Sequence, residues 1–195
     1  KLGIHGSATC TMAFGENGGA TGWLVGEENR GLACMFTMMN NARLHVGIQG
    51  VAIAERAFQQ ALAYAGERRQ GRKPGMGATQ TVAIIEHPDV RRNLMTMRAL
   101  TAAARAICYL TANAIDRAHH AADPDERARA LERANLLTPL AKAFSTDVGT
   151  QVASIGVQVH GGMGYIEETG AAQHLRDARI AQIYEGTNGI QAIDL

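Results

Sequence analysis

The sequence predicts a mainly α protein, an antiparallel up-and-down helical bundle preceded by a short β hairpin. Apolar residues recur at three- and four-residue spacing over three stretches of about thirty residues or more, which indicates long amphipathic helices. The connections between these stretches are short, so successive helices are expected to run antiparallel. The first part of the chain lacks this period, and we therefore expect a domain boundary between residues 1–30 and residues 31–195.

The hairpin is expected from the composition of residues 1–30. Residues 9–14 and 21–25 have strand-like compositions, and the glycine-rich run 15–22 has the composition of a turn. A two-stranded hairpin is only marginally stable by itself. We therefore expect the last hairpin of a sheet whose other strands lie outside this sequence.

The helical part contains five expected segments. Glycine- and proline-rich runs separate them, namely a loop at residues 71–77 and a break at residues 121–125 that contains Pro124. Pro139 could bend the third segment, and residues 161–164 end it. In chain order the expected helices cover residues 31–68, a stretch that begins near His87 and Pro88, residues 126–160, residues 169–179, and residues from about 187 to the end.

Composition and charge narrow the classes of function. A net charge of +1 without a basic block argues against nucleic acid as a main partner, and the few aromatic residues offer little stacking surface for bases. No stretch is long enough to span a membrane, and no signal peptide opens the sequence. Because the sequence begins at Lys1 without a methionine, we expect a fragment of a longer polypeptide.

The cysteines and histidines do not form a recognisable metal or disulfide pattern. Cys10, Cys34 and Cys108 are far apart and odd in number, which fits a reducing compartment better than a disulfide framework or a zinc site. The histidines show no His-x-x-x-His spacing. We therefore expect no metal site.

The run Ile183-Tyr184-Glu185-Gly186-Thr187 carries the first candidate for chemistry. It places one carboxylate between an aromatic residue and a glycine, after a basic, helix-like stretch. A glutamate on an apolar loop can serve as a general base. The alternative is that Gly186 caps a helix and that Glu185 is simply solvated. Taken alone, the run favours this alternative.

Four separated stretches change this interpretation when they are considered together. They are Lys1-Leu2-Gly3-Ile4 followed by Ser7, Thr9 and Phe14; Gly26-Glu27-Glu28-Asn29-Arg30-Gly31; Gln158-Val159-His160-Gly161-Gly162-Met163-Gly164-Tyr165; and the run at residues 183–187. In this order and at this spacing they resemble the C-terminal part of acyl-CoA dehydrogenases, flavoenzymes that desaturate acyl-CoA thioesters. The resemblance covers essentially the whole chain. It implies that residues 1–30 are the last strands of the family's middle β domain and that residues 31–195 form its C-terminal helical domain.

The resemblance implies that Glu185 is the base that removes the α-proton of an acyl-CoA, after which hydride passes from the β-carbon to FAD. In the family the backbone N–H of the base also binds the thioester carbonyl oxygen, which acidifies the α-carbon. Gly186 lets the backbone approach the substrate closely.

The resemblance also assigns residues of the first long helix to the substrate. Arg43 matches an arginine near the base and the pantetheine arm. A buried Arg43 needs a partner, and Glu185 or substrate would serve. Asn40 stands where many members have an acid that contacts the CoA adenine. Ala42 replaces an alternative base found in some members, which favours Glu185.

The remaining matches imply contacts with FAD. Arg68 aligns with an arginine that reaches the FAD pyrophosphate of a neighbouring subunit, and a planar guanidinium suits phosphate. Arg68 could equally complement the dipole of its own helix, and residues 161–164 could simply end a helix. Thr187 matches a flavin-contacting position at a helix start. The implied cofactor-binding residues are Arg68, Gln70, Gln158, Gly161, Gly162 and Thr187.

These assignments together imply the C-terminal part of a bacterial, cytoplasmic acyl-CoA dehydrogenase of fatty acid β-oxidation. The implied partners are an acyl-CoA substrate, an electron-transfer flavoprotein as acceptor, and further copies of the chain in a dimer or tetramer. We expect the 195 residues alone to bind FAD weakly and to be inactive. Two alternatives stay open, namely an acyl-CoA oxidase-type flavoenzyme that passes electrons to oxygen, and a helical oligomerisation module without catalysis of its own.

Overall fold

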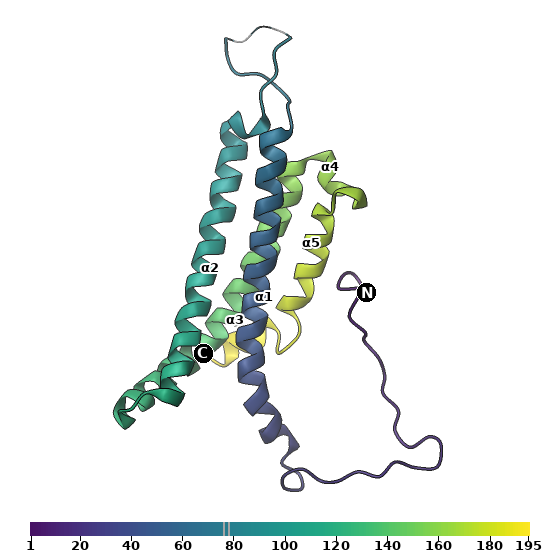
Figure 1. The fold of residues 1–195 in the computed structure, drawn as a ribbon, viewed down its shortest axis with the longest axis vertical. Helices are drawn as coiled ribbons and strands as arrows, with labels where there is room; N and C mark the ends of the chain where they lie inside the picture. The colour runs from purple at the N-terminus through teal and green to yellow at the C-terminus, as the bar shows by residue number, and fades with distance from the viewer. Residues whose placement is uncertain (76, 78) are drawn as a thin grey trace.

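The helices of the computed structural model form an antiparallel up-and-down bundle, as the sequence predicts (Figure 1). The structure describes residues 1–75, 77 and 79–195. In chain order the described helices are α1 (Gly31–Glu67), η1 (Ile84–Glu86), α2 (Pro88–His120), α3 (Pro124–His160), α4 (Gly162–Tyr165), η2 (Glu167–Thr169), α5 (Ala171–Ala178), η3 (Arg179–Gln182) and α6 (Asn188–Ile193). α3 packs along both α1 and α2, and the shorter α5 completes the bundle against α3 and α1.

The boundaries of α3 follow from its capping residues. The side chain of Asp123 accepts a hydrogen bond from the backbone N–H of Asp125 at 3.0 Å, which caps the helix. Pro124 is therefore the first residue of α3 rather than part of a break, because a proline in the first turn needs no N–H partner. α3 continues through Pro139 and ends at His160, and its C-cap is Gly161, where φ is 61°.

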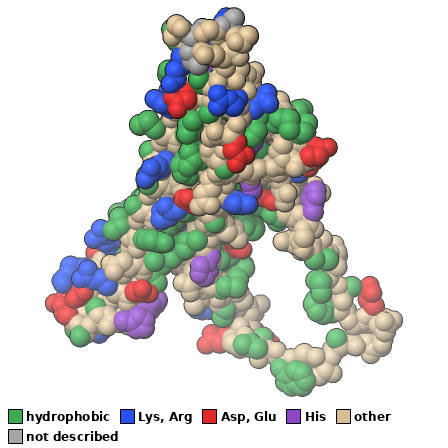
Figure 2. All heavy atoms as spheres, turned by 45° about the horizontal axis from the view of Figure 1, so that its top comes forward, with side chains coloured by type: hydrophobic (Ala, Val, Ile, Leu, Met, Phe, Trp, Pro, Cys, Tyr) green, Lys and Arg blue, Asp and Glu red, His purple; other side chains and the backbone are tan. Residues whose placement is uncertain are grey.

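The predicted β hairpin is wrong. Residues 1–30 contain no strand. Phe14 and Trp23, which belong to the two predicted strands, are 81% and 83% exposed. A hairpin becomes stable when one of its faces packs against further strands or a helix. Here the segment loops away from the bundle, and Figure 2 shows hydrophobic side chains along it.

The start of the chain nevertheless returns to the bundle beside α5. The backbone N–H of Ile4 donates to Oδ1 of Asp177 at 2.6 Å. A Cβ on Gly3 would lie 2.6 Å from the carbonyl oxygen of Arg176, so the two backbones meet at this glycine. The first residues and α5 therefore lie side by side although they are distant in sequence.

α1 and α3 approach each other closely through small residues. A Cβ on Gly50 would lie 2.3 Å from the carbonyl oxygen of Ser145, and one on Gly149 would lie 2.9 Å from the carbonyl oxygen of Gly50. Buried alanines continue the contact along α1, at positions 54, 57, 61 and 65. The alanine-rich composition thus produces close helix packing, which fixes α1 relative to α3 and with them the loops at their ends.

The connection between α1 and α2 is largely irregular in its described residues. An isolated antiparallel bridge joins Arg69 and Ala83, and η1 follows it. The predicted loop at residues 71–77 includes Met76, which together with Ala78 lies outside the described residues. No helix in the part of the chain that the structure describes is both long and apolar enough to cross a lipid bilayer.

Candidate active site

The structure separates the predicted site residues into two groups that lie toward opposite ends of the bundle. The first group, called the base end, lies around the first half of α1 and around α6, and comprises Asn40, Arg43, Glu185, Gly186 and Thr187. The second group, called the arginine end, lies where α1 and α3 finish, and comprises Arg68, Gln70, Gln158, Gly161 and Gly162. The α-helical rise of about 1.5 Å per residue separates Arg43 from Arg68 by about 37 Å.

The base end is built around a loop with a left-handed backbone at two successive residues. This loop joins η3 to α6, and φ is 57° at Glu185 and 80° at Gly186. Such an angle suits glycine but strains a glutamate. Glu185 is half-buried, and neither its carboxylate nor its backbone N–H makes a hydrogen bond or ion pair with another described residue. The predicted base is therefore available on a loop that is held in an uncommon conformation.

Two buried side chains hold this loop from the interior. Nζ of Lys142, on α3, donates to the carbonyl oxygen of Gly186 at 2.7 Å and to Oδ1 of Asn188 at 2.9 Å. Nε2 of Gln191, on α6, donates to the carbonyl oxygens of Glu185 and Gly186 at 3.3 and 3.2 Å. Lys142 and Gln191 are both 0% exposed. The two loop carbonyls are thus satisfied from inside the domain.

Burial also changes the acidity of Lys142. Removal from water disfavours the ammonium and lowers the pKa of Lys142 to about 8, an effect that Asp147 opposes and Arg43 reinforces. Oδ1 of Asp147 instead accepts hydrogen bonds from Gln182 at 2.6 Å and Asn188 at 2.7 Å. Among the described residues, Lys142 therefore has neutral acceptors and no ion-pair partner.

The residues on either side of Glu185 anchor the loop at its ends. Oγ1 of Thr187 accepts a hydrogen bond from the backbone N–H of Ile190 at 3.3 Å, so Thr187 caps α6. This confirms that Thr187 lies at a helix start. The hydroxyl of Tyr184 donates to the side chain of Gln49 on α1, and burial raises the pKa of Tyr184.

Arg43 is buried, but its partner differs from the expected one. Its Nη1 lies 2.7 Å from Oδ2 of Asp194. Of the two expected partners, Glu185 is wrong, because the end of α6 carries Asp194 to the guanidinium instead, and the substrate stays a prediction. A Cβ on Gly186 would lie 3.8 Å from Nη2 of Arg43, so the guanidinium also reaches the loop. Nε of Arg43 and Oε1 of Gln191 are buried, and neither has a hydrogen-bond partner among the residues that the structure describes.

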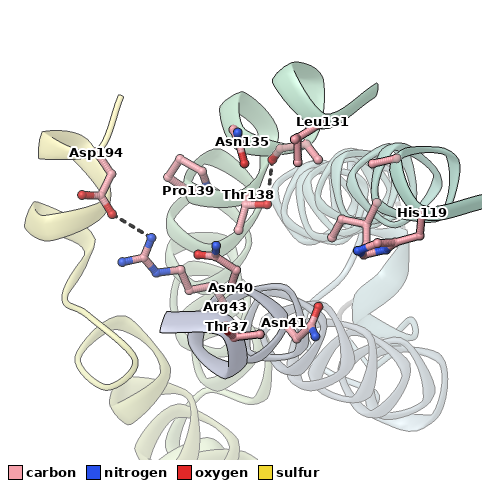
Figure 3. A pocket seen from close by; sticks show the side chains of 13 residues that line it. Thr37, Asn40, Asn41, Arg43, His119, Leu131, Asn135, Thr138, Pro139 and Asp194 are labelled. Atoms are coloured by element: carbon pink, nitrogen blue, oxygen red, sulfur yellow. Dashed lines mark hydrogen bonds and ion pairs between the residues drawn. The ribbon is translucent and has the colours of Figure 1, made fainter. Parts of the chain in front are cut away.

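A pocket of about 440 Å³ opens beside Arg43 (Figure 3). In Figure 3, Arg43 reaches from α1 toward Asp194, and His119 of α2 lies on the opposite side of the pocket. Polar residues that also line it are Thr37, Asn40 and Asn41 of α1 and Asn135 and Thr138 of α3. The structure therefore brings Asn40 and Arg43 into one pocket, and Arg43 connects this pocket to the Glu185 loop.

At the arginine end, an aromatic contact joins the last turns of two helices. Tyr64 of α1 stacks on His160 of α3 with ring centroids 4.5 Å apart. Nδ1 of His160 lies 2.7 Å from the carbonyl oxygen of Gly156. This junction brings Arg68 and the loop at residues 158–162 to the same end of the bundle.

The predicted residues of the arginine end are open to solvent. Arg68, Gln70 and Gln158 are exposed, and their side chains make no hydrogen bond or ion pair with other residues that the structure describes. A Cβ on Gly161 or Gly162 would meet no atom within 4 Å. This end therefore offers a guanidinium, two amides and bare backbone to a polar ligand.

Comparison with known proteins identifies the family. Residues 29–195 match the model of the acyl-CoA dehydrogenase C-terminal domain, which accounts for most of the chain. The chain belongs to the acyl-CoA dehydrogenase family.

Individual members of the acyl-CoA dehydrogenase family match the whole chain or most of it. The 3-methylmercaptopropionyl-CoA dehydrogenase of Ruegeria pomeroyi is 56% identical over 196 residues, which cover 100% of this chain and 32% of the relative. The butyryl-CoA dehydrogenase structure from Megasphaera elsdenii is 30% identical with a TM-score of 0.69, and the match covers 86% of this chain and 38% of that one. A chain in the structure described as the electron transferring flavoprotein of Acidaminococcus fermentans is 28% identical with a TM-score of 0.69, covering 87% and 39%. The 195-residue chain spans from 32% to 45% of the length of the curated relatives reported for it.

Four residues at the base end of this acyl-CoA dehydrogenase domain escaped the sequence analysis: Lys142, Asn188, Gln191 and Asp194. A signal existed for Lys142, since one lysine inside the run Leu-Ala-Lys-Ala-Phe at residues 140–144 indicates a cation among apolar neighbours. The other three gave no signal, because nothing in the pattern of residues 188–194 distinguishes a buried polar residue from a solvated one.

The titratable side chains that the structure describes can be compared with the ligand sets of metal sites. The described residues contain no group of three or more His, Cys, Asp and Glu side chains that could hold a metal ion. Cys108 is buried, and burial raises its pKa, whereas Cys10 and Cys34 are exposed.

Proposed function

We propose that this chain is the C-terminal helical part of an FAD-dependent acyl-CoA dehydrogenase and that Glu185 removes the α-proton of the substrate. One observation carries the proposal. Glu185 is half-buried, its carboxylate is free of ion pairs within the described residues, and buried side chains hold its loop in a left-handed conformation. A base needs a free carboxylate in a fixed position, and this arrangement supplies both.

The backbone of the same residue has a second role in this proposal. The N–H of Glu185 donates no hydrogen bond to another described residue, so it is available to the thioester carbonyl oxygen. A hydrogen bond to that oxygen would stabilise the negative charge that develops when the α-proton leaves. The carboxylate would hold the abstracted proton. Gly186, which has no side chain beside the reacting carbons, would let the substrate approach the loop.

FAD fits the arginine end by the chemistry of the groups found there. The exposed guanidinium of Arg68 suits the pyrophosphate, and the amides of Gln70 and Gln158 suit the polar edges of the adenosine. Open space at Gly161 and Gly162 would let the cofactor lie against backbone. When bound, FAD supplies the acceptor for the hydride that leaves the β-carbon.

The distance between the two ends supports a homo-oligomer. Because Arg43 and Arg68 are separated by about 37 Å of helix, one chain would offer Glu185 and Thr187 to one flavin and its arginine end to another. Such sharing requires at least a dimer, and a tetramer would satisfy it equally. In this proposal residues 1–30 end the middle β domain and residues 31–195 form the helical domain. The exposure of Phe14 and Trp23 supports this division, because neighbouring strands would cover them.

The relatives support a short acyl-CoA as substrate. The 56%-identical relative is named for 3-methylmercaptopropionyl-CoA and the matched Megasphaera elsdenii structure for butyryl-CoA. We propose an acyl chain of similar length, consumed in fatty acid β-oxidation or a related desaturation. The match to a structure described as an electron transferring flavoprotein supports such a protein as acceptor. The bacterial relatives support a location in the bacterial cytoplasm.

Replacement of Glu185 by glutamine in the full-length enzyme tests this function. Glutamine keeps the size of the side chain but cannot accept the proton. We expect the variant to retain FAD. The reduction of its bound flavin by 3-methylmercaptopropionyl-CoA or butyryl-CoA should slow by a factor of about 10² to 10⁴. The loss of visible absorbance of the flavin measures this rate. Unchanged reduction would contradict the proposal.

Matched controls separate this result from general damage and from the alternatives. Glu168→Gln changes an exposed glutamate that belongs to neither group of predicted site residues, and it should leave the rate unchanged. A palmitoyl-CoA substrate should react more slowly than the two short ones. Stoichiometric peroxide on reoxidation in air, in place of electron transfer to a flavoprotein, would identify an oxidase. A full-length protein without flavin would identify a helical assembly module.

A further inference from the structure

Lys142 is an unusual residue in the core of this domain. It is 0% exposed, and its ammonium has only neutral acceptors among the described residues. A buried cation without a carboxylate partner costs folding free energy. Burial lowers its pKa to about 8, which is the expected sign of that cost. A hydrophobic side chain of similar length would avoid this cost, so the contacts of the ammonium require a reason.

Both contacts of the ammonium lead to the loop that carries Glu185. Nζ donates to the carbonyl oxygen of Gly186 at 2.7 Å and to Oδ1 of Asn188 at 2.9 Å. Asn188 is in turn held by Asp147, whose Oδ1 accepts from its Nδ2 at 2.7 Å. Asp147, the carboxylate nearest to Lys142 in the sequence of α3, therefore binds Asn188. The ammonium of Lys142 binds the Gly186 carbonyl and the Asn188 amide oxygen instead of this carboxylate.

The direction of this carbonyl sets the orientation of the peptide that follows Gly186. No described peptide bond is cis, so a Gly186 carbonyl that points into the domain turns the N–H of Thr187 away from it. Lys142 turns the Gly186 carbonyl inward, and Gln191 receives the carbonyls of Glu185 and Gly186. The backbone at Glu185 has a φ of 57°, a conformation that is strained for a residue other than glycine and that persists when its surroundings impose it.

The charged groups around Lys142 come from several elements. Arg43 of α1 and Asp147 of α3 face it, and Glu185 lies close enough on the loop to favour the ammonium. Arg43 is itself neutralised by Asp194 at 2.7 Å. The ammonium therefore lies beneath the base without forming an ion pair with it, and it leaves the carboxylate free.

We propose that Lys142 is a positioning residue for the reaction, because it fixes the Gly186 carbonyl and thereby the placement of the Glu185 carboxylate against the α-carbon. This inference rests on the proposed function of Glu185. Lys142 does not touch the substrate in this arrangement. It acts through the backbone of the loop.

Lys142→Met in the full-length enzyme provides the test. Methionine fills the space with an unbranched apolar chain but donates no hydrogen bond. We expect flavin content and spectrum to be unchanged, KM for butyryl-CoA to change by less than about threefold, and kcat to fall about tenfold to a hundredfold, because a small misplacement of a reacting group costs rate rather than binding. Exchange of the α-proton of a 3-thiaacyl-CoA in deuterated water should fall by the same factor, since this analogue lacks a β-hydrogen and reports proton abstraction alone.

Two further variants make the result decisive. Lys142→Gln keeps an N–H donor without the charge and should lose less rate than Lys142→Met; it also serves if the methionine variant does not fold. Ser145→Ala removes a fully buried polar group on the same helix that contacts Cys108 and Ala104 of α2, and it should keep the wild-type rate.

The outcomes distinguish this inference from the proposed function. A kcat within twofold of the wild type for Lys142→Met, together with an inactive Glu185→Gln, would overturn the role of Lys142 and leave the role of Glu185 intact. An equal loss in Ser145→Ala would also overturn it, since the effect would then be one of packing. An active Glu185→Gln would instead overturn the proposed function itself.

Discussion

The base end and the arginine end are constructed in opposite ways. At the base end, a strained loop is held by two fully buried side chains, Lys142 and Gln191, and its carbonyls are satisfied inside the domain. At the arginine end, Arg68 and Gln158 are exposed, and their side chains have no hydrogen-bond or ion-pair partner among the described residues. The stacked rings of Tyr64 and His160 and the backbone hydrogen bonds of Arg68 and Gln70 form the ordered scaffold of this second end.

The difference shows which geometry the domain determines by itself. Where polar groups are satisfied within the chain, folding sets the positions of the reacting groups before any ligand arrives. Where side chains are exposed, their positions are set when a ligand or another chain binds, and part of the binding free energy is spent on ordering them. In the proposed function the first arrangement suits a base and the second suits a cofactor that is shared between subunits.

A pair of glycine substitutions should separate the two ends most strongly. Gly186→Ala places a Cβ 2.8 Å from Nε2 of the buried Gln191 and at a φ of 80°. We expect it to destabilise the chain by about 2–3 kcal/mol, from backbone strain together with the loss of hydrogen bonds to the loop carbonyls. Gly162→Ala meets open space, and its effect should stay within about 0.5 kcal/mol.

Urea unfolding of the 195-residue chain followed by circular dichroism measures both values. Equal destabilisation by the two substitutions would remove the contrast between a crowded base end and an open arginine end.

Arg68→Ala should affect the binding of the cofactor and leave the stability of the domain unchanged. The guanidinium is exposed and has no described partner to lose, whereas a hydrogen bond to a phosphate contributes about 1.5–3 kcal/mol. We expect the affinity of the full-length enzyme for FAD to fall about tenfold or more, measured by titration of the apoenzyme with flavin fluorescence. Arg133→Ala, on an exposed face of α3, is the matched control and should bind FAD like the wild type. An unchanged affinity for Arg68→Ala would leave this arginine as a helix-dipole residue.

The buried ammonium at the base end should produce a pH dependence of stability that the arginine end lacks. Burial lowers the pKa of Lys142 from 10.5 to about 8. Between these values the folded chain has lost a proton that the unfolded chain keeps, so the contribution of this group to stability rises with pH. Relative to Lys142→Met, the wild type should gain about 1 kcal/mol from pH 7 to pH 9, measured by urea unfolding at the two values.

Comparison with the variant is required because other groups act in the opposite direction. Burial raises the pKa of Cys108 above its ordinary 9.0. The contribution of this thiol to the free energy of unfolding therefore falls as the pH rises. The contribution of Cys108 is the same in both proteins and cancels in the difference. If the difference in unfolding free energy between the wild type and Lys142→Met did not change with pH, Lys142 would titrate as it does in water.

The prediction of the helices succeeded where local signals were strong. Periodic apolar residues gave α1, α2 and α3, and Pro88 lies in the first turn of α2 as expected. The start of α3 was placed two residues too late, at residue 126, for a local reason as well. A proline can end the preceding helix or occupy the first turn of the next one, and Pro124 does the second. The hairpin failed for a different reason. Strand composition produces a strand when a partner pairs with it, and Phe14 and Trp23 have none within this chain.

The sequence by itself determined the helical bundle, its antiparallel order and the position of Glu185 on a loop between helices. The family resemblance added the candidate residues at both ends. The tertiary structure alone decided which residues hold that loop, since Lys142, Gln191 and Asp194 come together only when α3 and α6 pack. It also gave Arg43 a partner in Asp194 rather than Glu185. The physical reason is one of range along the chain. Helical periodicity and capping depend on residues that are close in sequence. The free-energy cost of burying a charge or a carbonyl depends instead on which hydrogen-bond or ion-pair partner the fold places beside it.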